Sequence, residues 1–276
     1  MNDFYLHASV NPEYLLGEPE HKRSFIKEVV AHLKPLLELL ENKTVLLKAH
    51  DLDYEHLSKL QGNQSIDFNT RHLSGAGKFV ANPKLLELEL EILAILRNRE
   101  SLRNIWLAVP NVNSADELTE VKKIISSYGF RRSSTFKLYA LITRPLGMLS
   151  LKTIVDHEID AVGLDIDRIL DNLFGDADYT MTTDIATFLG WAVRTINSNK
   201  SRPVLMNRKH DIDKETLQLM VEKGLTEFIV PQKDLYQSRL LVSSIEITKV
   251  TKRRNAAERR KRSTTDSDIN RYAFSV

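Results

Sequence analysis

The chain has 276 residues, of which 42% are hydrophobic and 28% charged, with a net charge of +2 and no cysteine. This composition is typical of a globular protein with one large core, and the lack of cysteine excludes disulfides, thiolate metal sites and cysteine nucleophiles. No apolar run approaches the roughly 20 residues of a membrane-spanning helix, and residues 1–10 do not resemble a signal peptide, so a cytoplasmic protein without a membrane partner is expected.

Short apolar runs alternate with helical patterns as far as about residue 231. The expected strands, in chain order, are residues 4–9, 44–49, 104–110, 136–142, 161–164, 203–207 and 227–231. Their apolar residues are mostly consecutive, as in parallel strands that are covered on both faces. A broken eighth pattern lies near residues 69–79.

Helical spacing of apolar residues fills the intervals between these runs. Residues 82–97 form one such segment, with Asn82 and Pro83 as N-cap and first-turn residue. Residues 114–128 and 213–223 are similar. Eight strands in repeated βα units favour an α/β fold with a single closed (β/α)8 barrel over residues 1–250. An open doubly wound sheet is the alternative.

A basic tail follows the predicted barrel. Residues 251–276 contain eight basic and three acidic side chains, and seven of the basic ones lie within residues 252–262. The segment has no apolar face, so we expect it to be flexible. Basic runs bind nucleic-acid phosphates in a salt-dependent manner, but no aromatic residue is interleaved here. A nucleic-acid partner is therefore expected only through this tail, and a solvated tail is the alternative.

The segment VLLKAHDLDYEHLSKLQG at residues 45–62 resembles a phosphoenolpyruvate-binding strand and loop. That strand and loop belong to the C-terminal barrel of PEP-utilising enzymes, the phosphoenolpyruvate synthase and pyruvate phosphate dikinase family. The family strand carries an arginine where Lys48 stands here, and the family aspartate is kept as Asp51. Further similar segments follow in the same order, namely NPKLLELELEILAIL, IWLAVPNVNSADEL, LYALITRP and IDAVGLDIDRI. The resemblance covers residues 4–244 and implies a barrel.

The resemblance also implies where a metal would bind. In the family, two carboxylates hold a magnesium ion, which prefers hard oxygen ligands. Thr143 stands at the position of one of them, a glutamate. The other corresponds to Asp167 or Arg168, depending on a one-residue choice of register. Asp165 and Asp167 are therefore the candidate magnesium ligands, and the alternative is that they are N-cap residues of the following helix.

Arginines of the family clamp the oxyanions of phosphoenolpyruvate. Their Arg-Gly-Ala-Ser-Arg element resembles residues 74–78 here, where the first arginine is replaced by serine and the second by Lys78. The resemblance implies Lys48, Asp51 and Lys78 as substrate-binding residues, with Arg144 or Arg71 as compensating cations. Exposed loop cations without a ligand are the alternative.

The family's general acid, a cysteine, corresponds to Asn207, which cannot donate a proton in the same way. No segment resembles the family's ATP-grasp or phosphohistidine domains, so the chain alone is not expected to phosphorylate pyruvate with ATP. These losses predict a degenerate, non-catalytic barrel that acts as a scaffold or binds a protein partner, and the family implies a homodimer. The alternative is an enzyme or sensor that binds a small anion such as phosphoenolpyruvate or pyruvate with magnesium; if active, it would perform phosphotransferase-related chemistry.

Overall fold

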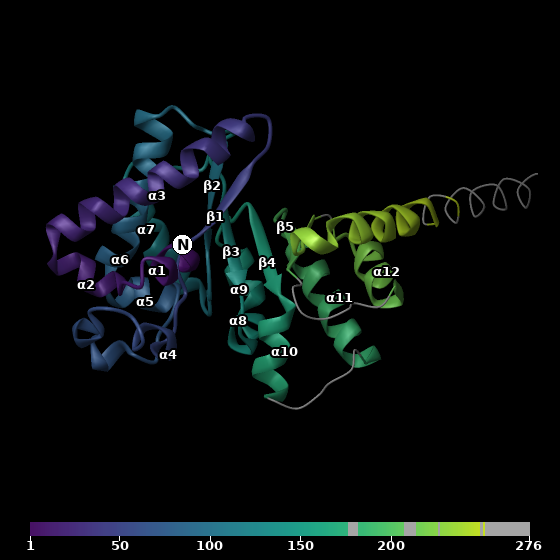
Figure 1. Cartoon of the computed structure of the whole chain (residues 1–276). Coiled ribbons are helices and arrows are strands. Elements are labelled where there is room, and N and C mark those ends of the chain that lie inside the picture. Colours follow the sequence, from purple (N-terminus) through teal and green to yellow (C-terminus); the bar gives the residue numbers. More distant parts are fainter. Residues whose placement is uncertain (176–181, 207–213, 226, 249–250, 252–276) are drawn as a thin grey trace, which may run out of the picture.

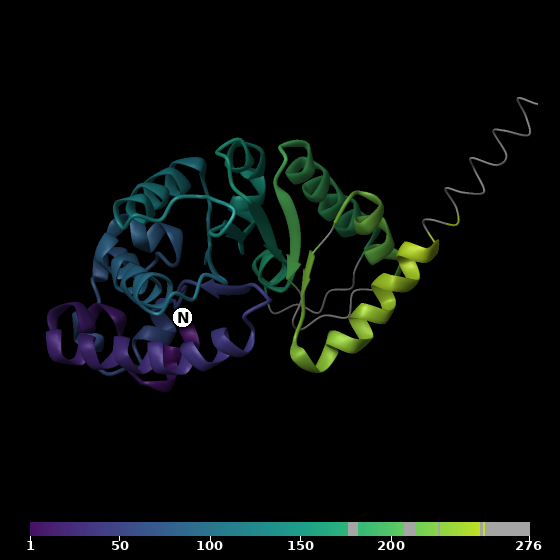
Figure 2. The same ribbon diagram turned by 90° about the horizontal axis from the view of Figure 1, so that it is seen from above.

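The computed structural model describes residues 1–175, 182–206, 214–225, 227–248 and 251 (Figure 1). A parallel sheet of six strands forms its centre, in the order β1-β2-β3-β4-β5-β6. The strands are β1 (Val45–Lys48), β2 (Ile105–Val109), β3 (Leu138–Ile142), β4 (Ala161–Asp165), β5 (Arg202–Met206) and β6 (Glu227–Ile229). Seen from above, the sheet curves as a half-barrel with the helices along its outer side (Figure 2).

Helices precede the sheet and connect its strands. They are α1 (Asn2–His7), α2 (Pro12–Gly17), α3 (Pro19–Leu39), α4 (Tyr54–Leu57), α5 (Ala76–Ala81), α6 (Pro83–Ala94), α7 (Ala115–Ser127), α8 (Pro145–Leu149), α9 (Leu151–Val155), α10 (Ile166–Phe174), α11 (Thr183–Ser198) and α12 (Lys214–Glu222). A further helix covers residues 235–248. Short turns of other helix types are η1 (Asn63–Ser65), η2 (Phe68–Thr70), η3 (Ile95–Arg99) and η4 (Gln232–Asp234).

The inner strands β2 to β5 are buried on both faces, which explains their consecutive apolar residues. Leu107 and Val109 of β2 belong to the main core, which also contains the leucine-rich face of α6. Ala108, between them in sequence, points to the opposite face and packs with Tyr139 and Met206 in a smaller cluster. No helix in the described part of the chain has the length and apolarity that crossing a membrane requires.

Two of the expected strands are wrong. Residues 4–9 were expected to form the first strand, but Asn2–His7 is a helix. Its Tyr5 is fully buried and stacks on Phe25 with ring centroids 4.8 Å apart. A short apolar run has too few residues for its period to distinguish strand from helix, so packing decides. Residues 69–79 contain η2 and the first part of α5 in place of a broken strand.

The other expected strands and the helices at residues 82–97, 114–128 and 213–223 are confirmed, with slightly different ends. The structure therefore establishes a parallel half-barrel of six strands, and the predicted closed barrel of eight strands is not confirmed. Asn207, at the end of one expected strand, and the basic residues 252–276 lie outside the described residues. The flexible tail stays a prediction.

Candidate functional site

A pocket lies where the first four strands end. Parallel strands bring their carboxyl ends to one edge, where binding sites of α/β proteins usually form. The pocket has a volume of ≈ 260 Å³. Its walls come from the segments after β1, β2 and β3, from the loop before α5 and from α10. The lining residues are Asp51, Asp53, Ser74, Asn111, Thr143, Arg144, Arg168, Asp171 and Asn172.

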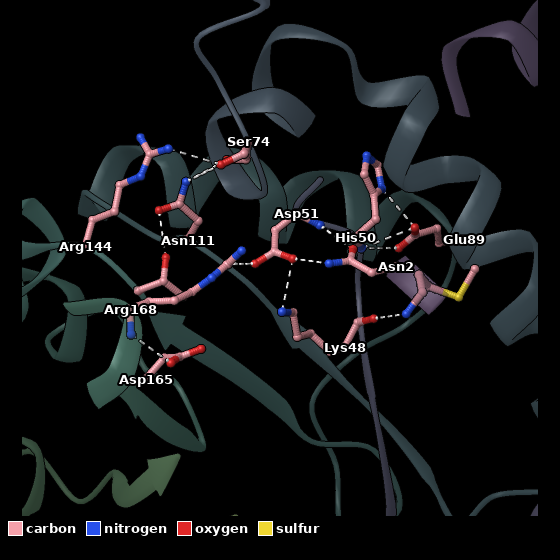
Figure 3. A network of polar contacts seen from close by, with 12 residues as sticks. Asn2, Lys48, His50, Asp51, Ser74, Glu89, Asn111, Arg144, Asp165 and Arg168 are labelled. Atoms are coloured by element: carbon pink, nitrogen blue, oxygen red, sulfur yellow. Dashed lines mark hydrogen bonds and ion pairs between the residues drawn. The ribbon is translucent and has the colours of Figure 1, made fainter. Parts of the chain in front are cut away.

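Asp51 is the most heavily bonded of these side chains (Figure 3). It follows β1 and is only 2% exposed. Lys48 Nζ lies 3.0 Å from its Oδ1, and Arg168 makes an ion pair with its Oδ2. Burial alone would raise the pKa of Asp51, but the charges of Lys48 and Arg168 and a hydrogen bond from Asn2 outweigh it and lower the pKa. Asp51 is therefore held as a carboxylate.

Asn2 joins α1 to this carboxylate through two hydrogen bonds. Its Nδ2 donates to Asp51 Oδ1 at 2.6 Å, and its Oδ1 accepts from the Asp51 backbone N–H at 2.9 Å. Beside it, the amino group of Met1 donates to the Lys48 carbonyl at 2.7 Å. The sequence gives no signal for Asn2, because the strand that it predicts at residues 4–9 provides no reason to place residue 2 near residue 51.

A chain of polar side chains crosses the other side of the pocket (Figure 3). Thr143 Oγ1 donates to Asn111 Oδ1 at 2.9 Å, and Asn111 Nδ2 donates to Ser74 Oγ at 2.8 Å. Arg144 Nη2 donates to the same hydroxyl at 3.4 Å. Asn111 is buried with a φ of 54°, a left-handed conformation that asparagine tolerates better than most residues. These bonds fix the neutral part of the wall.

Gly75 allows the Ser74 loop to approach the end of β2. Its φ is 55°, and a Cβ built on it would lie 2.3 Å from the Pro110 carbonyl oxygen. That same carbonyl accepts a hydrogen bond from the Ala76 N–H at 2.9 Å. Glycine is required here both for its conformation and for the close backbone approach.

The charged side chains of the pocket differ in whether they have ion-pair or hydrogen-bond partners. Arg168 is paired with Asp51, and Asp53 accepts hydrogen bonds from the N–H and the Nδ1 of His56 at 3.0 and 2.7 Å. Burial raises the pKa of Asp53, but the bonds to His56 outweigh it and lower the pKa. Arg144 has no ion pair with a carboxylate among the described residues, so its guanidinium keeps donors for a ligand.

The predicted substrate-binding residues are only partly brought together. Lys48 and Asp51 form an ion pair, and Arg144 lines the same pocket as Asp51. Lys78 lies elsewhere: its side chain is 2% exposed, its Nζ is 2.7 Å from Glu13 Oε1, and it donates to Thr70 Oγ1 at 3.0 Å. Lys78 thus belongs to a buried ion pair, and it is not among the residues that line the pocket.

The described residues do not by themselves form a magnesium site of the family type. Asp165 is the N-cap of α10 and accepts from the Arg168 N–H at 3.3 Å, so the N-cap alternative is confirmed for Asp165. Asp167 is buried in the first turn of α10, and neither side chain lines the pocket. Thr143 offers a neutral hydroxyl that is already bonded to Asn111. The described residues contain no group of three or more acidic, histidine or cysteine side chains suited to a metal.

A buried pair supports the loop that carries Asp51. The backbone N–H of His50 donates to both carboxylate oxygens of Glu89, at 3.3 and 3.2 Å, and His50 Nδ1 is 2.9 Å from Glu89 Oε1. Both residues are buried, with side chains that are 2% and 0% exposed. Glu89, on α6, therefore holds the residue that precedes Asp51. Its position on an otherwise apolar helix face was the available signal in the sequence.

The sequence is distantly similar to a phosphoenolpyruvate synthase. It is 21% identical over 262 residues to the probable phosphoenolpyruvate synthase of Staphylothermus marinus, a match that covers 89% of this chain and 31% of that protein. The chain thus spans about a third of the length of this curated relative. No protein-family model matches the chain.

Solved structures with partly similar folds include two enzymes. Malate synthase of Haloferax volcanii has a TM-score of 0.44 and 10% identity, over 54% of this chain and 49% of that one. Pyruvate kinase from Pyrobaculum aerophilum has a TM-score of 0.40 and 13% identity, over 53% of this chain and 33% of that one.

Proposed function

We propose that the chain binds a small carboxylate at the pocket beyond β1–β4 and does so without magnesium. The observation that carries the proposal is Arg144, a pocket guanidinium with no carboxylate partner in the described structure, beside the hydroxyl of Ser74. A guanidinium matches a carboxylate with two parallel hydrogen bonds. The volume of ≈ 260 Å³ suits a ligand of a few heavy atoms.

The distant similarity to phosphoenolpyruvate synthase suggests the class of ligand. Pyruvate and other short 2-oxo acids carry one carboxylate and one carbonyl, which Arg144 and the polar groups of Ser74, Asn111 and Thr143 can bind. Asp51 is engaged by Lys48, Arg168 and Asn2, so it acts as part of the wall and not as a free base.

The catalytic steps of the family are not part of this proposal. Thr143 replaces the family's metal-binding glutamate, and Ser74 replaces an arginine of the oxyanion clamp. Lys48 is paired with Asp51. A domain that keeps a carboxylate pocket and lacks these groups is expected to sense or carry the ligand, which is the alternative that the sequence offers to a scaffold, here without magnesium.

Calorimetric titration of the whole chain with pyruvate, oxalate and phosphoenolpyruvate, each with and without magnesium, tests the proposal. We expect binding that magnesium does not change. Arg144→Gln should weaken it roughly tenfold or more, because a charge-assisted hydrogen bond is worth about 1.5–3 kcal/mol. Arg71, the other cation that the family resemblance implies, lies over the Phe68 ring with its guanidinium carbon 3.6 Å from the ring centroid, and it does not line the pocket. Arg71→Gln therefore removes the same charge outside the lining, and the affinity should stay within about twofold. No heat at millimolar ligand, or equal losses in both variants, would refute the proposal.

A second candidate function is self-association through the helix over residues 235–248. Four of its large apolar side chains are exposed, namely Leu235 at 58%, Tyr236 at 71%, Leu240 at 53% and Ile247 at 67%. An apolar surface of this kind usually meets a partner. Sedimentation of the wild type and of Tyr236→Ser/Leu240→Ser tests it: a dimer that the double substitution dissociates supports self-association, and a monomeric wild type at 100 µM or so contradicts it.

A further inference from the structure

The pocket beyond β1–β4, lined by Asp51 and Arg144, is called the carboxylate pocket below. A second recess lies at the opposite end of the sheet. The segments before β2 and before β3 lie side by side there, because these two strands are parallel neighbours. The recess, called the basic recess below, has a volume of ≈ 240 Å³. Its lining residues are Arg97, Asn98, Arg103, Gly129, Phe130, Arg131, Ser133, Thr135 and Phe136. Three of them are arginines, and the lining includes no carboxylate.

None of the three guanidinium groups forms an ion pair with a carboxylate of the described residues. Arg97 is 7% exposed, and its Nη1 donates to the carbonyls of Arg103 and Ile105 at 2.9 and 2.7 Å. Burial lowers the pKa of Arg97, and the charge of Arg103 lowers it further. Arg103 and Arg131 make no ion pair within residues 1–175, where the whole recess lies. An anion bound among them would relieve this repulsion.

Hydroxyl groups complete the polar wall. Ser133 Oγ accepts from the backbone N–H groups of Thr135 and Phe136 at 3.3 and 3.1 Å, which fixes the loop after Arg131. Thr135 Oγ1 lies 3.2 Å from the same oxygen. Guanidinium groups with nearby hydroxyls are the donors that phosphate oxygens prefer.

An apolar recess adjoins the basic one and shares Phe130, Arg131 and Phe136 with it. Its volume is ≈ 380 Å³, and its other lining residues are Lys122, Ile125, Ser126, Arg132, Leu138 and Glu158. The rings of Phe130 and Phe136 lie 5.2 Å apart, and the Arg97 guanidinium carbon is 5.1 Å from the Phe136 ring centroid. A ligand could therefore place an anionic group in the basic recess and an apolar or flat group beside the phenylalanines.

We propose that the two recesses together bind a small organic phosphate of the nucleotide class, with its phosphate on Arg103 and Arg131. Both recesses are of small-molecule size. The base would fill the adjoining recess without stacking on a ring face, since Phe130 and Phe136 are only 6% and 3% exposed. A nucleic-acid strand is the poorer occupant, because its binding relies on successive bases stacking on open aromatic rings. This site is independent of the carboxylate pocket and of the function proposed for it.

The test uses calorimetric titration of the whole chain with ADP, pyrophosphate and adenosine at two salt concentrations. We expect ADP to bind more tightly than pyrophosphate, and adenosine to bind least. Arg103→Gln and Arg131→Gln should each weaken ADP binding roughly tenfold. Arg99→Gln is the matched control, because Arg99 is an exposed neighbour outside the lining and should change the affinity less than about twofold.

Other outcomes would overturn the assignment. Absence of ADP binding at millimolar concentration would refute the site, and an equal loss in Arg99→Gln would show unspecific attraction to the basic surface. Loss of ADP binding in Arg144→Gln, with Arg103→Gln unaffected, would place the ligand in the carboxylate pocket. Pyrophosphate binding as tight as ADP would refute the role of the apolar recess. A single-stranded oligonucleotide that binds a hundredfold more tightly than ADP would replace the small-molecule proposal by a nucleic-acid surface.

Discussion

A substitution in the buried ion pair between Lys78 and Glu13 distinguishes a structural role of Lys78 from contact with the ligand. Lys78→Met removes the cation while Glu13 keeps its carboxylate, whose side chain is 6% exposed. Breaking a buried pair from one side costs about 3–5 kcal/mol, because the remaining charge is left in a poorly solvated place. For a domain of this size, each kcal/mol lowers the melting temperature by about 2–4 °C. We therefore expect a decrease of roughly 6–20 °C.

The double variant Glu13→Gln/Lys78→Met should recover most of this loss. Glutamine carries no charge, and its carbonyl can still accept the bond that the Asp67 N–H now donates to Glu13 Oε2 at 2.9 Å. Lys59→Met is the control, because the Lys59–Glu55 pair has a similar length of 2.8 Å but side chains that are 67% and 78% exposed. An exposed pair of this kind is worth about 0–1 kcal/mol.

Urea unfolding followed by circular dichroism gives the free energies, and pyruvate titration gives the affinities. Lys78→Met should lower the stability while the folded protein keeps its affinity for pyruvate within about twofold. A variant that unfolds at the wild-type urea concentration but loses pyruvate binding tenfold would refute the reasoning, because Lys78 would then contact the ligand, as the family resemblance implies.

Three further predictions concern the close backbone contact at Gly75 and the titration of Asp51 and Tyr139. Gly75→Ala should destabilise the fold by more than the roughly 1–3 kcal/mol of backbone strain. Gly175 has a similar φ of 65°, but no atom of the described residues lies within 4 Å of an added Cβ, so Gly175→Ala should show the strain alone in urea unfolding. Because the pKa of Asp51 is lowered on folding, its contribution is present above its ordinary pKa of 3.8 and is lost as the pH falls through the folded value. The stability difference between wild type and Asp51→Asn should therefore shrink below pH 3.8, and a difference that grows there would contradict the assignment. Burial and the charge of Glu227 raise the pKa of Tyr139 from 10.0 to about 12, so Tyr139→Phe should remove tyrosinate absorbance that develops near pH 12, and should lessen the loss of stability between pH 10 and 12.

Most of the sheet could be predicted because strands that are covered on both faces have consecutive apolar residues in the sequence. The run LYALI of β3 is buried throughout, and that pattern alone predicts it as a strand. The run around Tyr5 is also short and apolar, but it forms a helix. A single buried tyrosine on this short helix fills the space beside Phe25 and His50. Local pattern cannot show which neighbour is available, so the number of strands was overestimated.

The candidate site was predictable only where a residue follows its own strand. Asp51 and Arg144 come directly after β1 and β3, so the strand ends place them at one edge. The direction of Lys78 depends on Glu13, a residue far earlier in the chain on a different helix. The pairing of Arg168 with Asp51 likewise joins α10 to the loop after β1. Such contacts are decided by tertiary packing, and no spacing in the sequence encodes them.

The π-helical turn η3 contributes Arg97 and Asn98 to the basic recess, so the recess depends on the number of residues in this turn. In this turn the Glu100 N–H donates to the Ile95 carbonyl at 3.0 Å, five residues back, so it holds one residue more than an α-helical turn. Deleting Leu96 would move Arg97 into the direction that Leu96 now takes, which is a fully buried place in the core. Insertions and deletions in this turn are therefore expected to be far more damaging than point substitutions, and the recess can be gained or lost by a change of one residue in length.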